Sequence, residues 1–402
     1  MEPTKNQLCD LETPCFILDV DELTKSVNGF SQALRAHFAQ SVVGYSVKTN
    51  STPYCMVKAM EAGAYAEVVS YDEYELALLC GFPKNRIVYN GPMKSEATFL
   101  DAVKHGAIVN IETKRELHWL NRLEADKQYA VGLRLNINIS QVSPEDADGE
   151  NDDSRFGFSV ETGEFAEAIE CIERLPNVKL AGLHIHRTAH SRSIRFYRKS
   201  VEYACQIIRR YQLNLNYLDI GGGYFGIFPN KPTYQQYSDA FYEVLAQYGM
   251  EKLCVIVEPG NALVASSFSF LSEVIDTKMV EPNCLFVTTD GSRNDVDPFF
   301  KKSCYLDEEI YQNERAPQVK KQVVSGCTCL EYDRLFALED KPRLSVGDRI
   351  LYHNVGAYTM CLTPMFIRYI PRIYAFQKGK YKLVREKWTA EEYIQKSNIN
   401  SK

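Results

Sequence analysis

Residues 42–50 read Val42-Val43-Gly44-Tyr45-Ser46-Val47-Lys48-Thr49-Asn50, an apolar run that ends in a lysine. A short apolar run rich in valine is typical of a strand that is buried on both faces of a parallel sheet. Seven similar runs follow, and segments with a helical spacing of apolar residues separate them. We predict these strands at residues 65–69, 86–89, 107–111, 129–136, 179–186, 217–220 and 253–257. Eight strands that alternate with helices predict an α/β fold, a closed (β/α)8 barrel of the TIM type.

A second domain is expected after the barrel in the sequence. The chain has 402 residues, which is more than one hydrophobic core usually holds. After Gly260 the helical spacing is lost, and short extended runs take its place. These runs lie at residues 270–275, 285–289, 322–325 and 349–352.

The composition limits the kind of partner. A formal charge of -6 gives no electrostatic footprint for nucleic acid or for an anionic membrane, so we expect a small-molecule partner. No stretch has the apolar length of a signal peptide core or a membrane span, and we expect a cytoplasmic protein. The 12 cysteines form no Cys-x-x-Cys pair, which indicates reduced core thiols and no metal site.

Polar residues gather where the predicted strands end. Barrel enzymes place their chemistry at the carboxyl ends of the strands, so these residues are predicted to share one face. Capping or solvation of the barrel rim is the simpler alternative for each of them. In strand order they are Lys48, Glu67, Asn90, Glu112, Arg134 with Asn136, His186, Gly221 to Gly223, and Glu258.

The residue types favour a lysine-bound aldehyde cofactor. Backbone N–H groups of Gly221, Gly222 and Gly223 can approach a phosphate closely, although a tight turn without a ligand stays open. No Walker or Rossmann motif surrounds them. Lys48 could form a Schiff base with pyridoxal phosphate, and Glu258 could face its pyridine nitrogen. His186 would then lie against the ring, or it is a structural histidine.

These motifs resemble the fold-type III pyridoxal-phosphate decarboxylases, which include diaminopimelate, ornithine and arginine decarboxylases. The resemblance runs from Thr13 to Phe376. The Tyr-x-x-Lys-x-Asn motif of the family is matched by Tyr45, Lys48 and Asn50. Its stacking histidine, glycine-rich phosphate loop and pyridine-nitrogen glutamate are matched in turn by His186, residues 218–223, and Glu258 in Glu258-Pro259-Gly260.

The resemblance implies further roles. Cys329 matches the proton-donating cysteine, Tyr358 a phosphate-binding tyrosine, and Glu67, Glu73 and Arg134 residues around the cofactor. It implies a barrel over residues 20–262 and a β-sandwich-like or β-barrel-like domain made of residues 1–19 and 263–402. The N-terminal strand near residues 15–19 would be part of this second domain. It also implies a homodimer in which the cysteine loop comes from the neighbouring subunit, so that active sites are shared.

Two phosphate ligands of the family are replaced. Asn261 stands where an arginine is usual, and Ala189 stands where a serine is usual. Arg187, Thr188 and His190 are candidate replacements. The glycine loop remains, so the identity of the cofactor is not affected.

The substrate pocket departs from the family as well. Leu330 follows Cys329, where diaminopimelate enzymes have an acid. Asp297 would repel a distal carboxylate, so standard meso-diaminopimelate is disfavoured. We expect an amino acid with an amine-bearing or otherwise non-acidic tail near Asp297 and Glu331. The alternative is that both acids face solvent.

The sequence therefore predicts a pyridoxal-phosphate-dependent decarboxylase that releases CO2 from an amino acid, with Lys48 holding the cofactor and Cys329 returning a proton. An amino-acid racemase of the same barrel family is one alternative, although such enzymes set an arginine against the ring nitrogen. A non-catalytic regulatory homologue is another, which the replaced phosphate ligands keep open. The acidic stretch 138–154 is expected to be a lid or, more simply, a disordered surface insertion.

Overall fold

The computed structural model describes residues 8–147, 153–187, 189–226, 228–301, 307–312 and 315–398. The chain divides into two compact units. The barrel unit comprises Thr24–Leu263, and the sheet unit comprises Met1–Leu23 together with Val264–Lys402.

Eight parallel strands close into the barrel, in the order in which they follow one another in the chain. Strand β2 pairs with β3 on one side and with β9 on the other, and this last pairing closes the ring. The predicted (β/α)8 fold is confirmed. The strands are β2 (Ser41–Ser46), β3 (Tyr65–Ser70), β4 (Ile87–Met93), β5 (Ile108–Ile111), β6 (Tyr129–Arg134), β7 (Val178–His184), β8 (Tyr217–Asp219) and β9 (Cys254–Val257).

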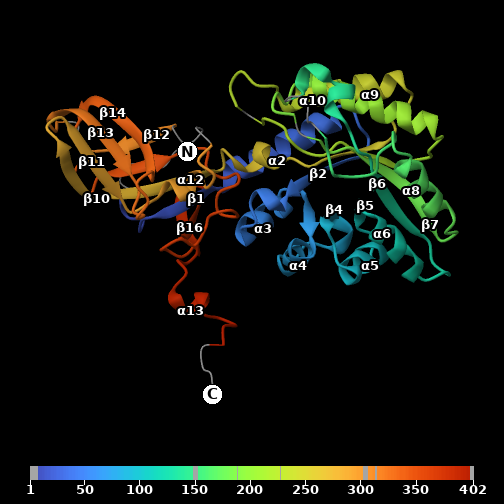
Figure 1. Ribbon diagram of the computed structural model, residues 1–402, viewed down its shortest axis with the longest axis horizontal. Coiled ribbons are helices and arrows are strands. Elements are labelled where there is room, and N and C mark those ends of the chain that lie inside the picture. The colour runs from blue at the N-terminus through green and yellow to red at the C-terminus, as the bar shows by residue number, and fades with distance from the viewer. Residues whose placement is uncertain are drawn as a thin grey trace. The chain divides into compact units, whose positions relative to one another are not determined.

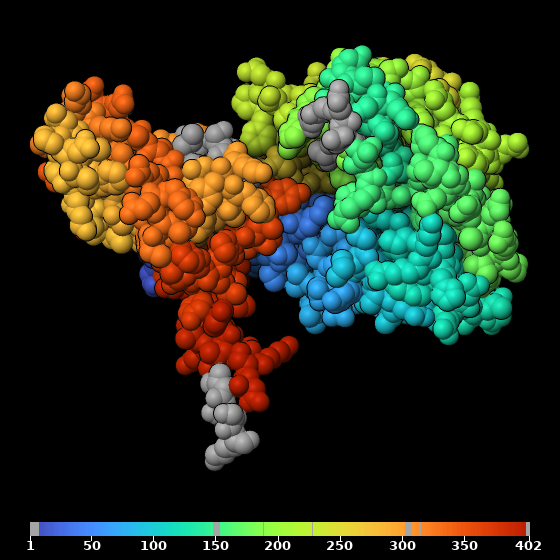
Figure 2. Space-filling view, viewed as in Figure 1, coloured from blue at the N-terminus to red at the C-terminus, as the bar shows by residue number. Residues whose placement is uncertain are grey.

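Helices surround the strands, with α3 to α6 along one side of the unit and α8 to α10 along another (Figure 1). On the side drawn in Figure 2, helices α4 to α6 and α8 form much of its outer surface. The helices are α2 (Val20–Arg35), α3 (Pro53–Glu61), α4 (Tyr71–Leu79), α5 (Glu96–Lys104), α6 (Lys114–Trp119), α7 (Ile139–Val142), α8 (Glu164–Glu173), α9 (Ile194–Arg210), α10 (Tyr234–Gln247) and α11 (Asn261–Val264). Short 3-10 segments are η1 (Val47–Thr49), η2 (Lys84–Arg86), η3 (Leu120–Arg122) and η4 (Pro144–Asp146).

Local sequence signals explain where several helices begin. The side chains of Ser70, Ser193 and Thr233 accept hydrogen bonds from backbone N–H groups in the first turns of α4, α9 and α10. Such caps satisfy N–H groups that have no partner inside the helix. The helices then pack their apolar faces on the strands, whose carboxyl ends all point to one end of the barrel.

The sheet unit is built on one mixed sheet of nine strands, so the predicted β-rich second domain is confirmed. Strand β1 pairs antiparallel with β10 and parallel with β16, although those strands lie far from it in the sequence. The strands are β1 (Cys15–Asp19), β10 (Phe268–Glu281), β11 (Cys284–Thr289), β12 (Glu308–Tyr311), β13 (Gln318–Ser325), β14 (Arg334–Pro342), β15 (Arg349–Tyr352), β16 (Arg372–Gln377) and β17 (Lys380–Arg385). Short helices α12 (Arg293–Val296) and α13 (Ala390–Tyr393) also belong to the unit.

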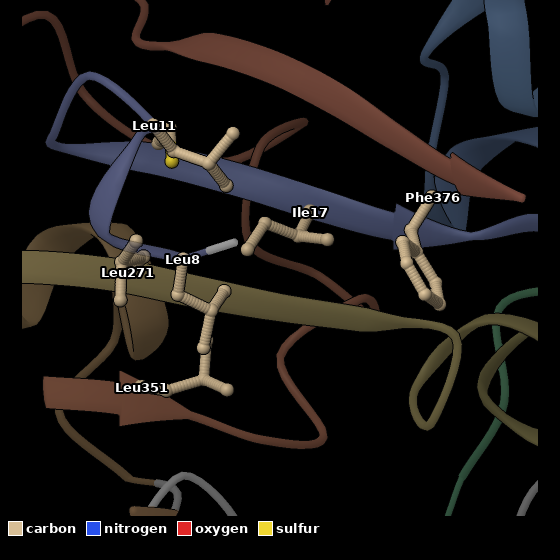
Figure 3. Packing of buried hydrophobic residues seen from close by; sticks show 7 residues of the cluster. Leu8, Leu11, Ile17, Leu271, Leu351 and Phe376 are labelled. Atoms are coloured by element: carbon tan, nitrogen blue, oxygen red, sulfur yellow. The ribbon is translucent and has the colours of Figure 1, made fainter. Parts of the chain in front are cut away.

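A cluster of buried apolar side chains holds β1 in the sheet unit (Figure 3). Burying such side chains contributes about 1.5–3 kcal/mol each. The cluster therefore anchors the start of the described chain to strands that come hundreds of residues later. Its members are Leu8, Leu11, Cys15, Ile17, Leu271, Leu351 and Phe376.

The acidic stretch 138–154 differs from the expected disordered insertion in its described part. Residues 139–146 form α7 and η4, and Asp146 is buried. Its carboxylate accepts hydrogen bonds from Ser143, Ser191, Ser193 and Arg195. These four donors lie before and after Asp146 in the chain and hold the segment in place. Its acidic composition alone is typical of a solvated loop. Residues 148–152 lie outside the described part of the chain.

Within the described ranges, no helix has both the length and the apolar character that crossing a membrane requires.

Candidate active site

Lys48 lies in η1, directly after β2, and its amine meets a buried carboxylate. Its Nζ donates to Glu67 Oε2 at 2.7 Å and to Ser46 Oγ at 2.9 Å. The Ser46 hydroxyl donates to the same carboxylate oxygen at 2.6 Å. Glu67 is buried, whereas the Lys48 side chain is 33% exposed, so the amine stays accessible to a small molecule.

Glu258 follows β9 and is also buried. One amide group, that of Asn90, donates to both Glu258 Oε1 and Glu67 Oε1. Beside Glu258, burial raises the pKa of Asp219 well above its usual value, and the negative charge of Glu258 raises it further. Burial and the neighbouring acid thus both favour a proton on the Asp219 carboxyl.

Two histidine rings lie parallel beside these carboxyl groups. The centroids of His184 and His186 are 6.2 Å apart, with 9° between the ring planes. Burial lowers the pKa of both histidines, and the positive charge of Arg134 lowers it further. The Gly222 N–H donates to His186 Nδ1 at 2.9 Å, which is possible because that nitrogen carries no proton. His186 is thus a neutral plate with a fixed orientation.

The glycine run approaches this plate too closely for a side chain. Gly221 has φ +76°, and a Cβ there would lie 2.5 Å from His186 Cβ and Nδ1. A Cβ on Gly222 would lie 2.4 Å from the carbonyl oxygen of Glu258. The Tyr197 hydroxyl fixes the loop from outside by donating to the Gly222 carbonyl at 2.8 Å. Glycine is therefore required here for close backbone approach, as in phosphate-binding loops.

Arg134 supports His186. Its Nη1 donates to Glu112 Oε1 at 2.9 Å, and its Nη2 donates to the carbonyl of His186 at 3.0 Å. Its guanidinium carbon lies 4.7 Å from the centre of the Phe156 ring. Both charged groups are buried, and their pairing offsets the cost of removing them from water.

The remaining predicted residues of the barrel unit lie near the same strand ends. Gly260 packs against Thr49, because a Cβ on Gly260 would lie 2.1 Å from Thr49 Oγ1. Asn261 begins α11. Of the candidate replacements for phosphate ligands, Arg187 is half-buried and His190 is exposed, while Thr188 lies outside the described residues.

Four predicted site residues belong to the sheet unit: Cys329, Tyr358, Asp297 and Glu331. Cys329 is exposed in the loop after β13. The buried carboxylate of Asp333 holds that loop, accepting hydrogen bonds from Ser292 Oγ and from the N–H and hydroxyl of Thr328. Tyr358 is partly exposed and has a positive φ of 54°.

The two acids predicted near the substrate tail differ in exposure. Asp297 is fully buried, and its Oδ2 accepts from Arg293 Nη2 at 3.0 Å while its Oδ1 accepts from the Lys301 N–H. Glu331 is exposed. A substrate contact at Asp297 would require its ion pair with Arg293 to open, and this contact stays a prediction.

Sequence reasoning missed Ser46, Asn110 and Asp219. Asn110 donates to Asn90 Oδ1 and to Asp219 Oδ2, so all three missed residues contact residues of the predicted set or their partners. A polar residue in a buried strand or at its last position was the available signal, since a buried polar side chain seldom lacks a partner.

Among the described residues, one group has the donor atoms for a metal ion. The ligand atoms of His184, Asp219 and Glu258 lie within 4.8 Å of one another. Metal ligands must be deprotonated, whereas burial and the charge of Glu258 raise the pKa of Asp219. The donor set fits pyridoxal phosphate instead, because it combines an accessible lysine amine, a buried carboxylate, a neutral aromatic plate and a glycine cradle.

Comparison with known proteins agrees with this arrangement. The profile of the family described as "Pyridoxal-dependent decarboxylase, pyridoxal binding domain" matches residues 22–265. The diaminopimelate decarboxylase of Aquifex aeolicus is 26% identical over 379 residues, which cover 91% of this chain and 88% of that protein. The probable chloroplastic diaminopimelate decarboxylase of rice, Oryza sativa subsp. japonica, is 27% identical over 366 residues, which cover 88% and 73%.

Solved structures share the fold. The diaminopimelate decarboxylase of M. jannaschii superposes with a TM-score of 0.83 at 23% identity, covering 97% of this chain and 93% of that one. The arginine decarboxylase of Paramecium bursaria Chlorella virus gives 0.73 at 18% identity, with 91% and 96% covered. The family match spans more than half of the chain and includes the lysine, histidine, glycine and glutamate positions described above. The chain therefore belongs to the pyridoxal-dependent decarboxylases, carboxy-lyases that act with pyridoxal phosphate.

Proposed function

We propose that Lys48 binds pyridoxal phosphate covalently and that the protein removes the α-carboxylate of an amino acid, its small-molecule substrate, as CO2. The observation that carries this proposal is the pairing of the accessible Lys48 amine with buried Glu67, at the strand ends where Glu258 also lies. Lysine is the residue that joins this cofactor, and a carboxylate suits its pyridine nitrogen.

The bound cofactor supplies an electron sink for the pair left on the substrate α-carbon. Glu258 would face the ring nitrogen and stabilise a proton there, and Asp219, whose pKa is raised, lies beside it. His186 would support one face of the ring. Glu67 and Ser46 would hold the Lys48 amine in place while the substrate is bound.

The phosphate is proposed to bind at the glycine run, with Tyr358 and Asn261 as further ligands. The close approach of Gly221 and Gly222 to neighbouring atoms supports this proposal, because it leaves no room for side chains and the loop is lined by backbone atoms. The N–H groups of Gly221 and Gly222 donate to Asp219 Oδ1 and His186 Nδ1, so the N–H of Gly223 is the one proposed to bind the phosphate.

Cys329 is proposed to return a proton to the substrate carbon from a second copy of the chain. Its exposure and the rigid support of its loop by Asp333 favour this role. The protein would then be a homodimer with shared active sites.

For the substrate, we propose an amino acid with an amine-bearing tail. Glu331 is the exposed acid of the predicted pair, and Arg293 neutralises Asp297. The relatives named above include diaminopimelate and arginine decarboxylases, so a substrate panel should hold both compounds beside ornithine and lysine. Release of CO2 from arginine, ornithine or lysine in preference to meso-diaminopimelate is the expected result.

The covalent link is tested by borohydride reduction of the cofactor-loaded protein, followed by peptide mapping. We expect the label on Lys48, and Lys48→Arg should lose both label and CO2 release. Lys84→Arg is the matched control, because Lys84 is equally exposed at 33% and also pairs with a carboxylate at 2.7 Å. A label at another lysine, or undiminished turnover in Lys48→Arg, would refute the proposal.

A further inference from the structure

The side chain of Asn90 bridges the two acids of the site. Asn90 lies buried in β4, and its Nδ2 donates to Glu67 Oε1 at 3.2 Å and to Glu258 Oε1 at 2.5 Å. A side-chain amide nitrogen has two hydrogens, and here each points to a different carboxylate. The acid that meets Lys48 and the acid proposed to meet the cofactor ring therefore share one donor group.

A second amide fixes the orientation of the first. Asn110 in β5 donates to Asn90 Oδ1 at 2.8 Å and to Asp219 Oδ2 at 3.0 Å, and its own Oδ1 accepts from the Tyr217 hydroxyl at 2.9 Å. Rotating the Asn90 amide by half a turn would set its oxygen against two carboxylates and its nitrogen against the Asn110 nitrogen. The described contacts thus permit one orientation only.

We propose that Asn90, oriented by Asn110, is a positioning residue that fixes the carboxylates of Glu67 and Glu258 with respect to each other and keeps both as acceptors. This inference rests on the proposed function, since it assigns Glu258 to the cofactor ring. Its consequence is that cofactor binding at Glu258 and amine binding at Glu67 depend on one amide group.

The substitution Asn90→Asp keeps the shape of the side chain but replaces the donor with an acid. The new carboxyl group would face Glu67 on β3 and Glu258 after β9. Further charged or titratable groups nearby are Lys48, His184 on β7 and Asp219 on β8. Burial and two like charges favour the protonated form of the new acid, which can still donate one hydrogen bond. Once it ionises, three carboxylates repel one another.

The test is a titration of each apoprotein with pyridoxal phosphate between about pH 5 and about pH 9, followed by the visible absorbance of the bound cofactor. For Asn90→Asp, the affinity relative to the wild type should fall about tenfold per pH unit above the pKa of the new acid. Asn90→Ala should lose at least about tenfold at every pH, because two charged acceptors lose their donor. Circular dichroism at each pH checks folding, and the alanine variant carries the test if the aspartate variant does not fold.

Asn177→Asp is the matched control. Asn177 is buried in the same barrel unit but donates to a backbone carbonyl, that of Glu124. Its variant should keep a pH-independent affinity ratio to the wild type. The same flat ratio for Asn90→Asp, or wild-type affinity for Asn90→Ala, would overturn the inference. Failure of borohydride to label Lys48 in the wild type would instead overturn the proposed function, so the two failures are distinguishable.

Discussion

The carboxyl group of Glu73 is partly buried in the first turn of α4, near Lys48 and Glu67. Burial raises its pKa from 4.5 to about 7, the charge of Glu67 adds to the rise, and the N–H of Val69 and the charge of Lys48 oppose it. Between these values the folded protein holds a proton that the unfolded chain releases. Folding stability therefore falls as the pH rises through this window.

The pH dependence of unfolding tests this effect. A rise from 4.5 to about 7 corresponds to about 3 kcal/mol of stability lost by pH 8, as an order of magnitude. Glu73→Gln should flatten the slope of unfolding free energy against pH between about pH 4.5 and about pH 7, as measured by urea denaturation. Glu75→Gln, an exposed position on the same helix, should leave the slope unchanged. An unaltered slope in Glu73→Gln would show that another group titrates there.

Single residues differ in how far the sequence reveals them. Lys48 and Glu258 stand at the ends of apolar runs, so their place follows from strand direction alone. Ser46 and Asp219 are the last residues of β2 and β8, and their partners depend on register between strands, which no local pattern records. The sequence therefore predicted Lys48 and Glu258, but not Asp219 and Ser46, which belong to the same hydrogen-bond network.

At the scale of elements, the strands were predictable because each is a short apolar run between helices. Their ends shift by one or two residues, except that β4 ends at Met93, four residues after the predicted end. Strand β7 ends at His184, two residues before the predicted end, because the His186 carbonyl accepts from Arg134 and its ring accepts from Gly222. Long-range polar contacts of this kind compete with the hydrogen bonds between strands, and the local sequence does not reveal them.

The segment α7–η4 was not predictable, because Asp146 finds its partners about 45 residues further along the chain. Burial raises the pKa of this acid, but hydrogen bonds from Ser191, Arg195, Ser143 and Ser193 outweigh that effect and lower it to about 2. A lowered pKa means that the stabilisation is present above about pH 4 and is lost only as the pH falls towards 2.

Removing this carboxylate should release the segment at neutral pH. Asp146→Ala leaves several donors without their acceptor, which costs about 2–4 kcal/mol locally. Limited proteolysis within residues 139–153 should therefore become at least about tenfold faster. The neighbouring exposed Glu145, changed to alanine, serves as the control. Equal cleavage rates for the two variants would contradict the anchoring role of Asp146.

At the scale of the whole molecule, the proposed shared sites make a prediction about mixtures. Lys48→Ala and Cys329→Ser should each be inactive alone. If Cys329 acts across a homodimer, unfolding and refolding an equal mixture should restore about a quarter of the wild-type rate, because half of the dimers are mixed and each holds one intact site. CO2 release is the measurement. A mixture that stays inactive while affinity capture of a tagged Lys48→Ala subunit recovers the Cys329→Ser subunit would place both residues of a site in one chain.

The two-unit organisation followed from length and from the loss of helical spacing after Gly260, but the pairing partners of β1 did not. This strand also constrains biosynthesis. A ribosome releases residues 15–19 well before their parallel neighbour, residues 372–376, which follows about 350 residues later. The barrel can close before β16 is available to pair with β1. Stalled or truncated chains that lack β16 would therefore expose an unpaired strand edge, to which chaperones or other such chains can bind.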